Sequence, residues 1–211
     1  MKINTEFIRI ALVGAPGAGK TSVMKILKKS VAPSSFEIGF INEAATVLMQ
    51  DPSIRALRSS DPVAFQEKVS LTQFFQEDGD TLRVLSSGIS KYLQITDRAI
   101  QDMYVYLNDG QRSAMKLPIP TLEELNRRYD AVICFELYDS GASLKAGNGL
   151  RAEKAMSDIR TVYEKSLSVY SRHKNFHPVS PCDRITDKAK RVAELIEETV
   201  GERLFLIEND G

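Results

Sequence analysis

The stretch Gly14-Ala15-Pro16-Gly17-Ala18-Gly19-Lys20-Thr21 fits the G-x-x-x-x-G-K-[ST] pattern of a phosphate-binding loop, the P-loop, at every specified position. The apolar residues 7–13 before it predict a buried strand, and residues 22–29 after it predict a helix. Glycines let consecutive backbone N–H groups turn toward an anion, and the helix N-terminus adds the positive end of its dipole. The stretch through Ser22 therefore predicts a binding site for nucleotide phosphates. A glycine-rich turn without a ligand is the alternative, which the flanking strand and helix disfavour.

Two side chains of this loop have expected roles in that site. Lys20 is expected to reach the β- and γ-phosphates, where its positive charge offsets theirs. The hydroxyl of Thr21 is expected to ligate Mg²⁺, as the Ser or Thr of the motif does. The loop thus predicts a nucleotide bound together with a magnesium ion.

The composition indicates a globular protein of one α/β domain, residues 1–211, or one such domain with an insertion. Lys plus Arg and Asp plus Glu each number 28, so no net charge favours a polyanion, and we expect no nucleic-acid partner. We recognise neither a signal peptide nor a transmembrane segment, so we expect a cytoplasmic protein without a membrane partner. Cys134 and Cys182 show no spacing typical of a disulfide framework or a metal site.

Strand and helix patterns alternate along the chain. Further strands are predicted over residues 36–41, 91–96, 131–137 and 176–179. Further helices are predicted after Asp61, over 98–107, after Thr121, over 151–171 and within 186–200. This alternation predicts an α/β fold in three layers, with a parallel sheet covered by helices on both faces and right-handed crossovers.

The segment between the second and third strands carries two helix starts. Asp51-Pro52 and Asp61-Pro62 each place an N-cap aspartate before a proline at the first helical position. In the second helix, Phe65, Phe74 and Phe75 are expected to be core residues rather than a platform for a base. Residues 77–80, which include a glycine, are predicted to end this helix.

Polar residues follow the predicted strands, where ligands bind in open α/β sheets. Asp97 is expected to hold Mg²⁺ directly or through water, and Arg98 to bind a phosphate or orient an acceptor. The alternative is an N-cap aspartate followed by a surface arginine. Glu43 is expected to accept the proton of an acceptor hydroxyl, and the alternative is a first-turn glutamate that complements a helix dipole.

Arg151 and Lys145 flank a glycine-rich segment after the fourth strand. Positive groups on such a flap would close over the phosphates and stabilise charge during transfer, with Arg151 the better candidate. An ordinary solvated loop with a helix-start arginine is the alternative.

Beyond the P-loop, a family similarity rests on Asn42-Glu43-Ala44-Ala45, Thr96-Asp97-Arg98, Asp102, Tyr106, Arg151, Tyr170 and Arg184. Together these residues resemble the AAA-type domains related to nucleoside and nucleotide kinases, a group that includes the ribosylnicotinamide-kinase-like domain of bacterial NAD regulators. The Asp97-Arg98 pair is also similar to the Asp-Arg element of thymidylate-kinase-like enzymes, where the arginine meets the acceptor. The resemblance implies a P-loop NTPase sheet in the order 2-3-1-4-5, a helical acceptor-covering insertion over 44–90, a lid over 140–151, and ATP with Mg²⁺ as the donor.

Two functions are consistent with these features. The first is a kinase that transfers the γ-phosphate of ATP to a nucleoside-like or nucleotide-like acceptor, with Lys20, Glu43, Asp97, Arg98 and Arg151 as catalytic residues. The second is a regulatory nucleotide-binding ATPase or GTPase module that acts through a partner. A GTPase switch is disfavoured because no Asn-Lys-x-Asp motif occurs, and a remodelling ATPase because no apolar run ends in Asp-Glu. The acceptor and the oligomeric state do not follow from the sequence.

Overall fold

A five-stranded parallel sheet forms the centre of the molecule. The computed structural model describes residues 5–137 and 156–208. The strands are β1 (Glu6–Gly14), β2 (Glu37–Ile41), β3 (Lys91–Asp97), β4 (Ala131–Phe135) and β5 (Phe176–Val179). Their spatial order is β2-β3-β1-β4-β5, and every neighbouring pair is parallel. The predicted parallel sheet and its order are both confirmed.

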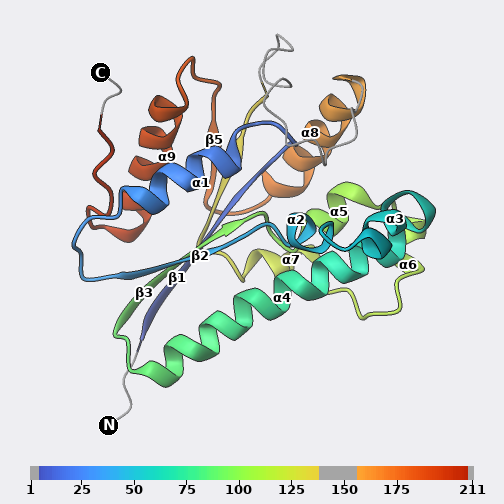
Figure 1. Cartoon of the computed structure of the whole chain (residues 1–211), viewed down its shortest axis with the longest axis horizontal. Helices are drawn as coiled ribbons and strands as arrows, with labels where there is room; N and C mark the ends of the chain where they lie inside the picture. Colours follow the sequence, from blue (N-terminus) through green and yellow to red (C-terminus); the bar gives the residue numbers. More distant parts are fainter. Residues whose placement is uncertain (1–4, 138–155, 209–211) are drawn as a thin grey trace.

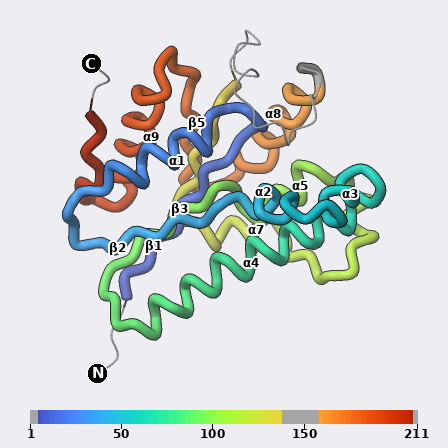
Figure 2. The backbone as a smooth tube through the Cα atoms, in the orientation of Figure 1, coloured from blue at the N-terminus to red at the C-terminus, as the bar shows by residue number. Residues whose placement is uncertain are grey.

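Helices cover both faces of this sheet (Figure 1). One face carries α1 (Lys20–Lys29) and α9 (Ile185–Val200). The other carries α4 (Pro62–Ser87), α5 (Asp102–Tyr106) and α8 (Met156–Tyr170). Four short helices complete the described part of the chain: α2 (Ala44–Leu48), α3 (Pro52–Ser60), α6 (Asp109–Ser113) and α7 (Leu122–Asn126). The tube in Figure 2 shows the same three layers, which the sequence predicted.

The central strand β1 divides the core into two halves. Ile10 and Leu12 pack on the side of α1 and α9, whereas Ala11 and Val13 pack on the side of α8. Successive side chains of a strand point to opposite faces, so a strand covered on both faces reads as a continuous apolar run.

The insertion between β2 and β3 contains α2, α3 and α4. Both predicted caps form: the Asp51 carboxylate accepts from the N–H groups of Ser53 and Ile54, and that of Asp61 accepts from Ala64 N–H. The prediction that residues 77–80 end α4 is wrong. The helix continues to Ser87 because Glu77 faces inward, where Arg128, Tyr129 and Arg9 surround its carboxylate.

The prediction for the phenylalanines of α4 holds only in part. Phe65 is buried and Phe74 is half-buried, but Phe75 is 74% exposed. Four of the six buried residues of this helix are polar, whereas Leu71, Phe75, Leu82 and Leu85 are exposed, so much of the apolar pattern lies on the outward face. A hydrophobic pattern reports which side chains share a face and leaves open which way the face points.

The helix predicted over residues 98–107 forms only over Asp102–Tyr106. Arg98 has φ of 79°, a left-handed conformation that a helix cannot contain. Its carbonyl accepts a hydrogen bond from the Thr96 hydroxyl at 2.7 Å, which stabilises this turn. Downstream, Asn108 starts α6 through a capping box with Gln111.

The strand register brings the carboxyl ends of three strands to one level. Leu12 of β1 lies beside Asp97, and Ile41 of β2 lies beside Thr96. Gly14, where the P-loop begins, lies beside Phe135. The P-loop and the residues after β2 and β3 therefore meet at one edge of the sheet.

Candidate functional site

The P-loop has the backbone that an anion cradle needs. Gly14, Gly17 and Gly19 have φ of 120°, 83° and 97°, a region that other residues rarely adopt. A Cβ at Gly14 would also lie 2.5 Å from the carbonyl oxygen of Phe135, so a side chain is excluded there. Gly19 precedes the first residue of α1, so the loop ends at a helix N-terminus.

Lys20 is buried beneath this loop. Its Nζ donates hydrogen bonds of 2.9 Å to the carbonyl oxygens of Gly14 and Ala15. Burial and then repulsion from the Arg98 guanidinium lower the pKa of Lys20 to about 8. An anion bound in the loop would stabilise the ammonium form of Lys20 and so raise its pKa again.

Thr21 and Asp97 form a second part of the site. The Thr21 hydroxyl donates to Asp97 Oδ2 at 3.0 Å, while the other carboxylate oxygen is buried with no hydrogen-bond partner in the described residues. Burial raises the pKa of Asp97, and the Lys20 charge opposes that rise. Mg²⁺ prefers oxygen ligands and commonly binds through one or two protein groups plus substrate phosphates and water. The hydroxyl and the unpartnered carboxylate oxygen fit such an ion.

Arg98 links the strand ends. Its Nε donates to Glu43 Oε1 at 2.5 Å, and its Nη1 donates to Asp102 Oδ2 at 3.0 Å and to the Gly14 carbonyl at 3.3 Å. Its guanidinium also lies 5.7 Å from the ring centre of Tyr106. Arg98 is buried, so the alternative of a surface arginine at a helix start does not describe it.

Glu43 is the residue before α2, and its carboxylate contacts Arg98 and the Thr46 hydroxyl. Burial favours the neutral acid, but the Arg98 charge and the hydrogen bond from Thr46 outweigh it and lower the pKa of Glu43 to about 2. Glu43 is therefore ionised at neutral pH and able to accept a hydrogen bond from a hydroxyl.

This ion pair makes the stability of the fold pH-dependent. The pKa of Glu43 falls from 4.5 to about 2 on folding, so the ionised group stabilises the native state above pH 4.5 and less as the pH falls toward 2. We expect Glu43→Gln to lower the free energy of unfolding at neutral pH by up to about 3 kcal/mol. Urea unfolding of both proteins at several pH values should show this difference shrink in the acid range. A difference that stays constant would contradict the proposed pairing.

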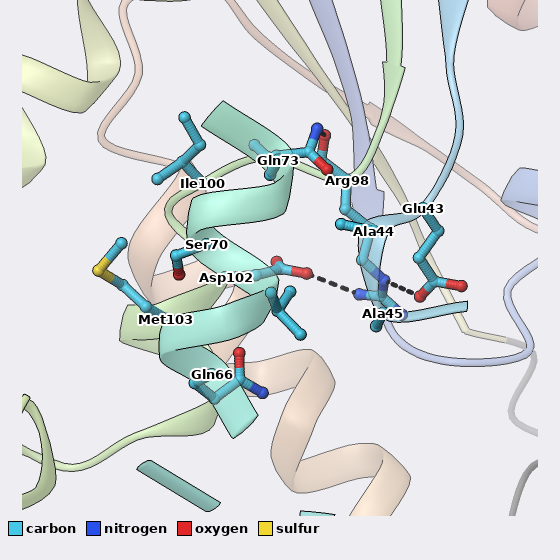
Figure 3. A pocket seen from close by; sticks show the side chains of 12 residues that line it. Glu43, Ala44, Ala45, Gln66, Ser70, Gln73, Arg98, Ile100, Asp102 and Met103 are labelled. Atoms are coloured by element: carbon cyan, nitrogen blue, oxygen red, sulfur yellow. Dashed lines mark hydrogen bonds and ion pairs between the residues drawn. The ribbon is translucent and has the colours of Figure 1, made fainter. Parts of the chain in front are cut away.

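A pocket lies directly beside Arg98 and Glu43 (Figure 3). It is bounded by α4, by the start of α2 and by the segment from Arg98 to Met103. Its polar lining consists of Glu43, Gln66, Ser70, Gln73, Arg98 and Asp102. It is narrow, with room for about one water molecule. A larger ligand would need the helical insertion to move outward.

Some of these residues were not singled out from the sequence. Gln66, Ser70 and Gln73 look like solvent-facing residues of a helix, and only their shared spacing indicates a common face. Asp102 also receives a hydrogen bond of 2.6 Å from the Tyr170 hydroxyl, which ties α8 to the site. This contact joins residues 68 positions apart, and no local pattern predicts it.

The remaining predicted residues lie elsewhere. Ser22 is exposed in the first turn of α1. Arg151, Lys145 and the predicted lid over 140–151 lie outside the described residues. Residues 5–137 and 156–208 include neither a cluster of three or more His, Cys, Asp or Glu side chains able to hold a metal nor a helix with the length and hydropathy to cross a membrane.

Comparison with known proteins assigns the family. No curated protein matches the chain. The family described as the AAA domain matches residues 9–184, which include the P-loop, Glu43 and the Asp97-Arg98 pair. The match spans most of the 211 residues. The chain, with its phosphate-binding loop at the carboxyl edge of a 2-3-1-4-5 sheet, belongs to the AAA domain family.

Proposed function

We propose that this protein is an ATP-dependent kinase that transfers the γ-phosphate to a hydroxyl of a nucleoside-like or nucleotide-like acceptor. The observation that carries the proposal is the polar pocket beside the P-loop. Arg98 lines this pocket and also contacts Gly14, the first residue of the loop. A group bound there would lie next to the phosphates that the loop holds.

P-loop AAA domains generally bind a nucleotide with Mg²⁺, and this site fits both. In the proposed reaction ATP supplies the phosphoryl group, and Mg²⁺ offsets part of its charge. Lys20 and the N–H groups of the loop would hold the phosphates, while Thr21 and Asp97 would hold the metal ion. Arg151 remains our candidate for a further cation over the phosphates.

The acceptor side of the site uses Glu43 and Arg98. The Glu43 carboxylate would accept a hydrogen bond from the acceptor hydroxyl and so orient its oxygen toward the γ-phosphate. The Arg98 guanidinium would hold that carboxylate in place and stabilise the charge of the group being transferred. Because Arg98 is buried and the Glu43 side chain is only 11% exposed, water competes little for these interactions.

A regulatory nucleotide-binding module that acts through a partner is the second candidate. The narrowness of the pocket favours it, because the described conformation admits no acceptor larger than a small molecule such as water. A screen of nucleosides, nucleotides and ribosylnicotinamide for phosphate transfer from ATP tests the two candidates. Phosphorylation of an acceptor supports the kinase, whereas hydrolysis without any transfer supports the regulatory module.

Arg98→Ala is expected to damage use of the acceptor, with ATP affinity nearly unchanged. Removal of the guanidinium leaves Glu43 and Asp102 without their common partner, so the variant also loses stability. Arg98→Lys keeps the positive charge but loses the planar guanidinium that donates to both Glu43 and Asp102. It serves as the comparison variant because it leaves a cation beside the two carboxylates. Steady-state kinetics should show a raised KM for the acceptor and a lowered kcat in both. Wild-type kinetics in both variants would exclude the acceptor role.

Asp97→Asn is expected to blunt the Mg²⁺ dependence of turnover, because the amide is a weaker ligand than the carboxylate. It still accepts the hydrogen bond from Thr21, so the fold should persist. A magnesium titration of the rate, with Asp130→Asn as a control distant from the P-loop, measures the effect. Identical magnesium curves for Asp97→Asn and the wild type would remove Asp97 from the metal site.

A further inference from the structure

Lys188 is a buried lysine that the P-loop pattern does not include. It lies in the first turn of α9 and is only 4% exposed. Its Nζ donates a hydrogen bond of 3.3 Å to the carbonyl oxygen of Ala18 and lies 5.6 Å from the ring centre of Phe135. Within the described residues it makes these contacts and no salt bridge. Lysines are almost never fully buried unless their charge is paired, so this position points to a specific role.

Helix α9 approaches the P-loop at the last glycine of the motif. A Cβ at Gly19 would lie 3.2 Å from Cδ1 of Ile185 and 4.0 Å from Cδ of Lys188. Helices α1 and α9 also pack against each other on one face of the sheet (Figure 1). The hydrogen bond from Lys188 to Ala18 joins residues 170 positions apart. The fold therefore brings a second buried lysine to the loop, in addition to Lys20.

The carbonyl that Lys188 holds belongs to the peptide between Ala18 and Gly19. In a planar trans peptide, the C=O of one residue and the N–H of the next point in opposite directions. Because the Ala18 carbonyl points toward Lys188, the Gly19 N–H points to the other side of the peptide. This N–H makes no hydrogen bond within the described residues. It is therefore a donor available to an anion in the loop.

The two buried lysines hold different carbonyls of the same loop. Lys20 donates to the carbonyls of Gly14 and Ala15, whereas Lys188 donates to that of Ala18. Burial lowers the pKa of Lys188, as it does that of Lys20, and the nearby Cys182 and Glu136 oppose the change at Lys188. A bound anion would stabilise the ammonium form of both lysines.

We propose that Lys188 is a positioning residue of the nucleotide site, which turns the Gly19 N–H toward the phosphates by holding the carbonyl of Ala18. Lys20 exchanges its loop carbonyls for phosphate oxygens, whereas Lys188 keeps its carbonyl when the nucleotide binds. Its charge also attracts the phosphates, because water screens a buried charge only weakly. The proposal rests on nucleotide binding by the P-loop, which the proposed function shares, and does not depend on transfer to an acceptor.

Two substitutions and two probes test this role. Lys188→Met removes the charge and the donor and keeps an unbranched apolar chain, whereas Lys188→Arg keeps a charge and donors. Calorimetry with Mg²⁺ measures the affinities for ATP and for tripolyphosphate, which lacks the base and the sugar. We expect Lys188→Met to weaken both by about tenfold or more, the scale of a lost charge-assisted hydrogen bond. Lys188→Arg is expected to bind both probes more tightly than Lys188→Met.

Arg191→Met is the matched control on the same helix. Arg191 is exposed and pairs with Glu194 at 2.9 Å, so this change removes one positive charge of α9 at the surface. We expect the control to bind both probes like the wild type. Thermal unfolding sets the temperature of the calorimetry well below the transition of every variant.

The wild-type protein provides a test that needs no substitution. Labelling the glycines with ¹⁵N follows the Gly19 amide by NMR while tripolyphosphate and Mg²⁺ are added. We expect its proton resonance to move downfield, because a hydrogen bond to a phosphate oxygen deshields the proton. A Gly19 resonance that stays in place while those of Gly14 or Gly17 move would overturn the proposed orientation.

The affinities also separate this proposal from the proposed function. Wild-type affinity of Lys188→Met for both probes would overturn the role of Lys188, and so would a loss confined to ATP or an equal loss in Lys188→Arg. If the wild type binds both probes but phosphorylates no acceptor, the kinase proposal fails and the expected losses at Lys188 still support its role. If the wild type binds neither probe, both proposals fail.

Discussion

Lys20→Ala is expected to reduce turnover by at least about 10²-fold and to weaken ATP binding, because it removes a buried positive charge that two carbonyls of the phosphate loop hold in place. In the described structure the ammonium group is held by two loop carbonyls and is otherwise buried. It is therefore positioned before the nucleotide arrives, and little reorganisation is needed when phosphate oxygens replace those carbonyls. Calorimetry with ATP and Mg²⁺ measures affinity, and a coupled assay of ADP release measures turnover.

Lys25→Ala is the matched control for this variant. Lys25 is an exposed lysine of the same helix, α1, so its removal changes the net charge equally without touching the loop. We expect the control to bind and turn over like the wild type. If Lys20→Ala keeps both its affinity and its turnover, the assignment of the P-loop as the nucleotide site is wrong.

Glu43→Gln is expected to lower the rate of phosphate transfer by about 10²–10⁴-fold, the range for a positioned acid-base group. That range corresponds to roughly 3–5 kcal/mol of activation free energy. The low pKa makes Glu43 a weak proton acceptor, so we expect the loss to come from orientation of the hydroxyl and of Arg98 as well as from proton transfer. ATP affinity should stay nearly unchanged because Glu43 lies on the acceptor side of the site.

The control for Glu43→Gln is Glu37→Gln. Glu37 is the first residue of β2, whose last residue is Ile41, and its side chain pairs with Arg83 at the surface. The measurement is steady-state kinetics with an acceptor found in the screen, for both variants and the wild type. If no acceptor is phosphorylated and Glu43→Gln shares the slow hydrolysis of the wild type, the kinase proposal yields to the regulatory one.

The sequence was most informative where the structure depends on neighbouring residues. The P-loop occupies eight consecutive positions, and the strand before it and the helix after it form as expected. The aspartate caps before α3 and α4 and the Thr121 capping box before α7 are also local, and all three form. Each depends on hydrogen bonds between groups a few residues apart, which a short stretch of sequence specifies.

Predictions failed where distant residues decide the outcome. The helix expected from residue 98 begins only at Asp102, because the carbonyl and side chain of Arg98 are held by Thr96, Glu43 and the P-loop in a left-handed conformation. Helix α4 passes through Gly79 because Glu77 is anchored by arginines from β1 and from the segment before β4. In both places a long-range contact outweighs local propensity.

The sequence by itself determined the phosphate-binding loop, the alternation of strands and helices, and the polar residues that end the strands. These follow from contiguous patterns whose physical basis is backbone geometry and side-chain periodicity. Only the tertiary structure decided that α4 turns Gln66, Ser70 and Gln73 inward, and that they meet Glu43, Arg98 and Asp102 around one pocket. Periodicity defines the two faces of a helix, but the choice between them depends on the buried charges across the sheet, which only folding brings together.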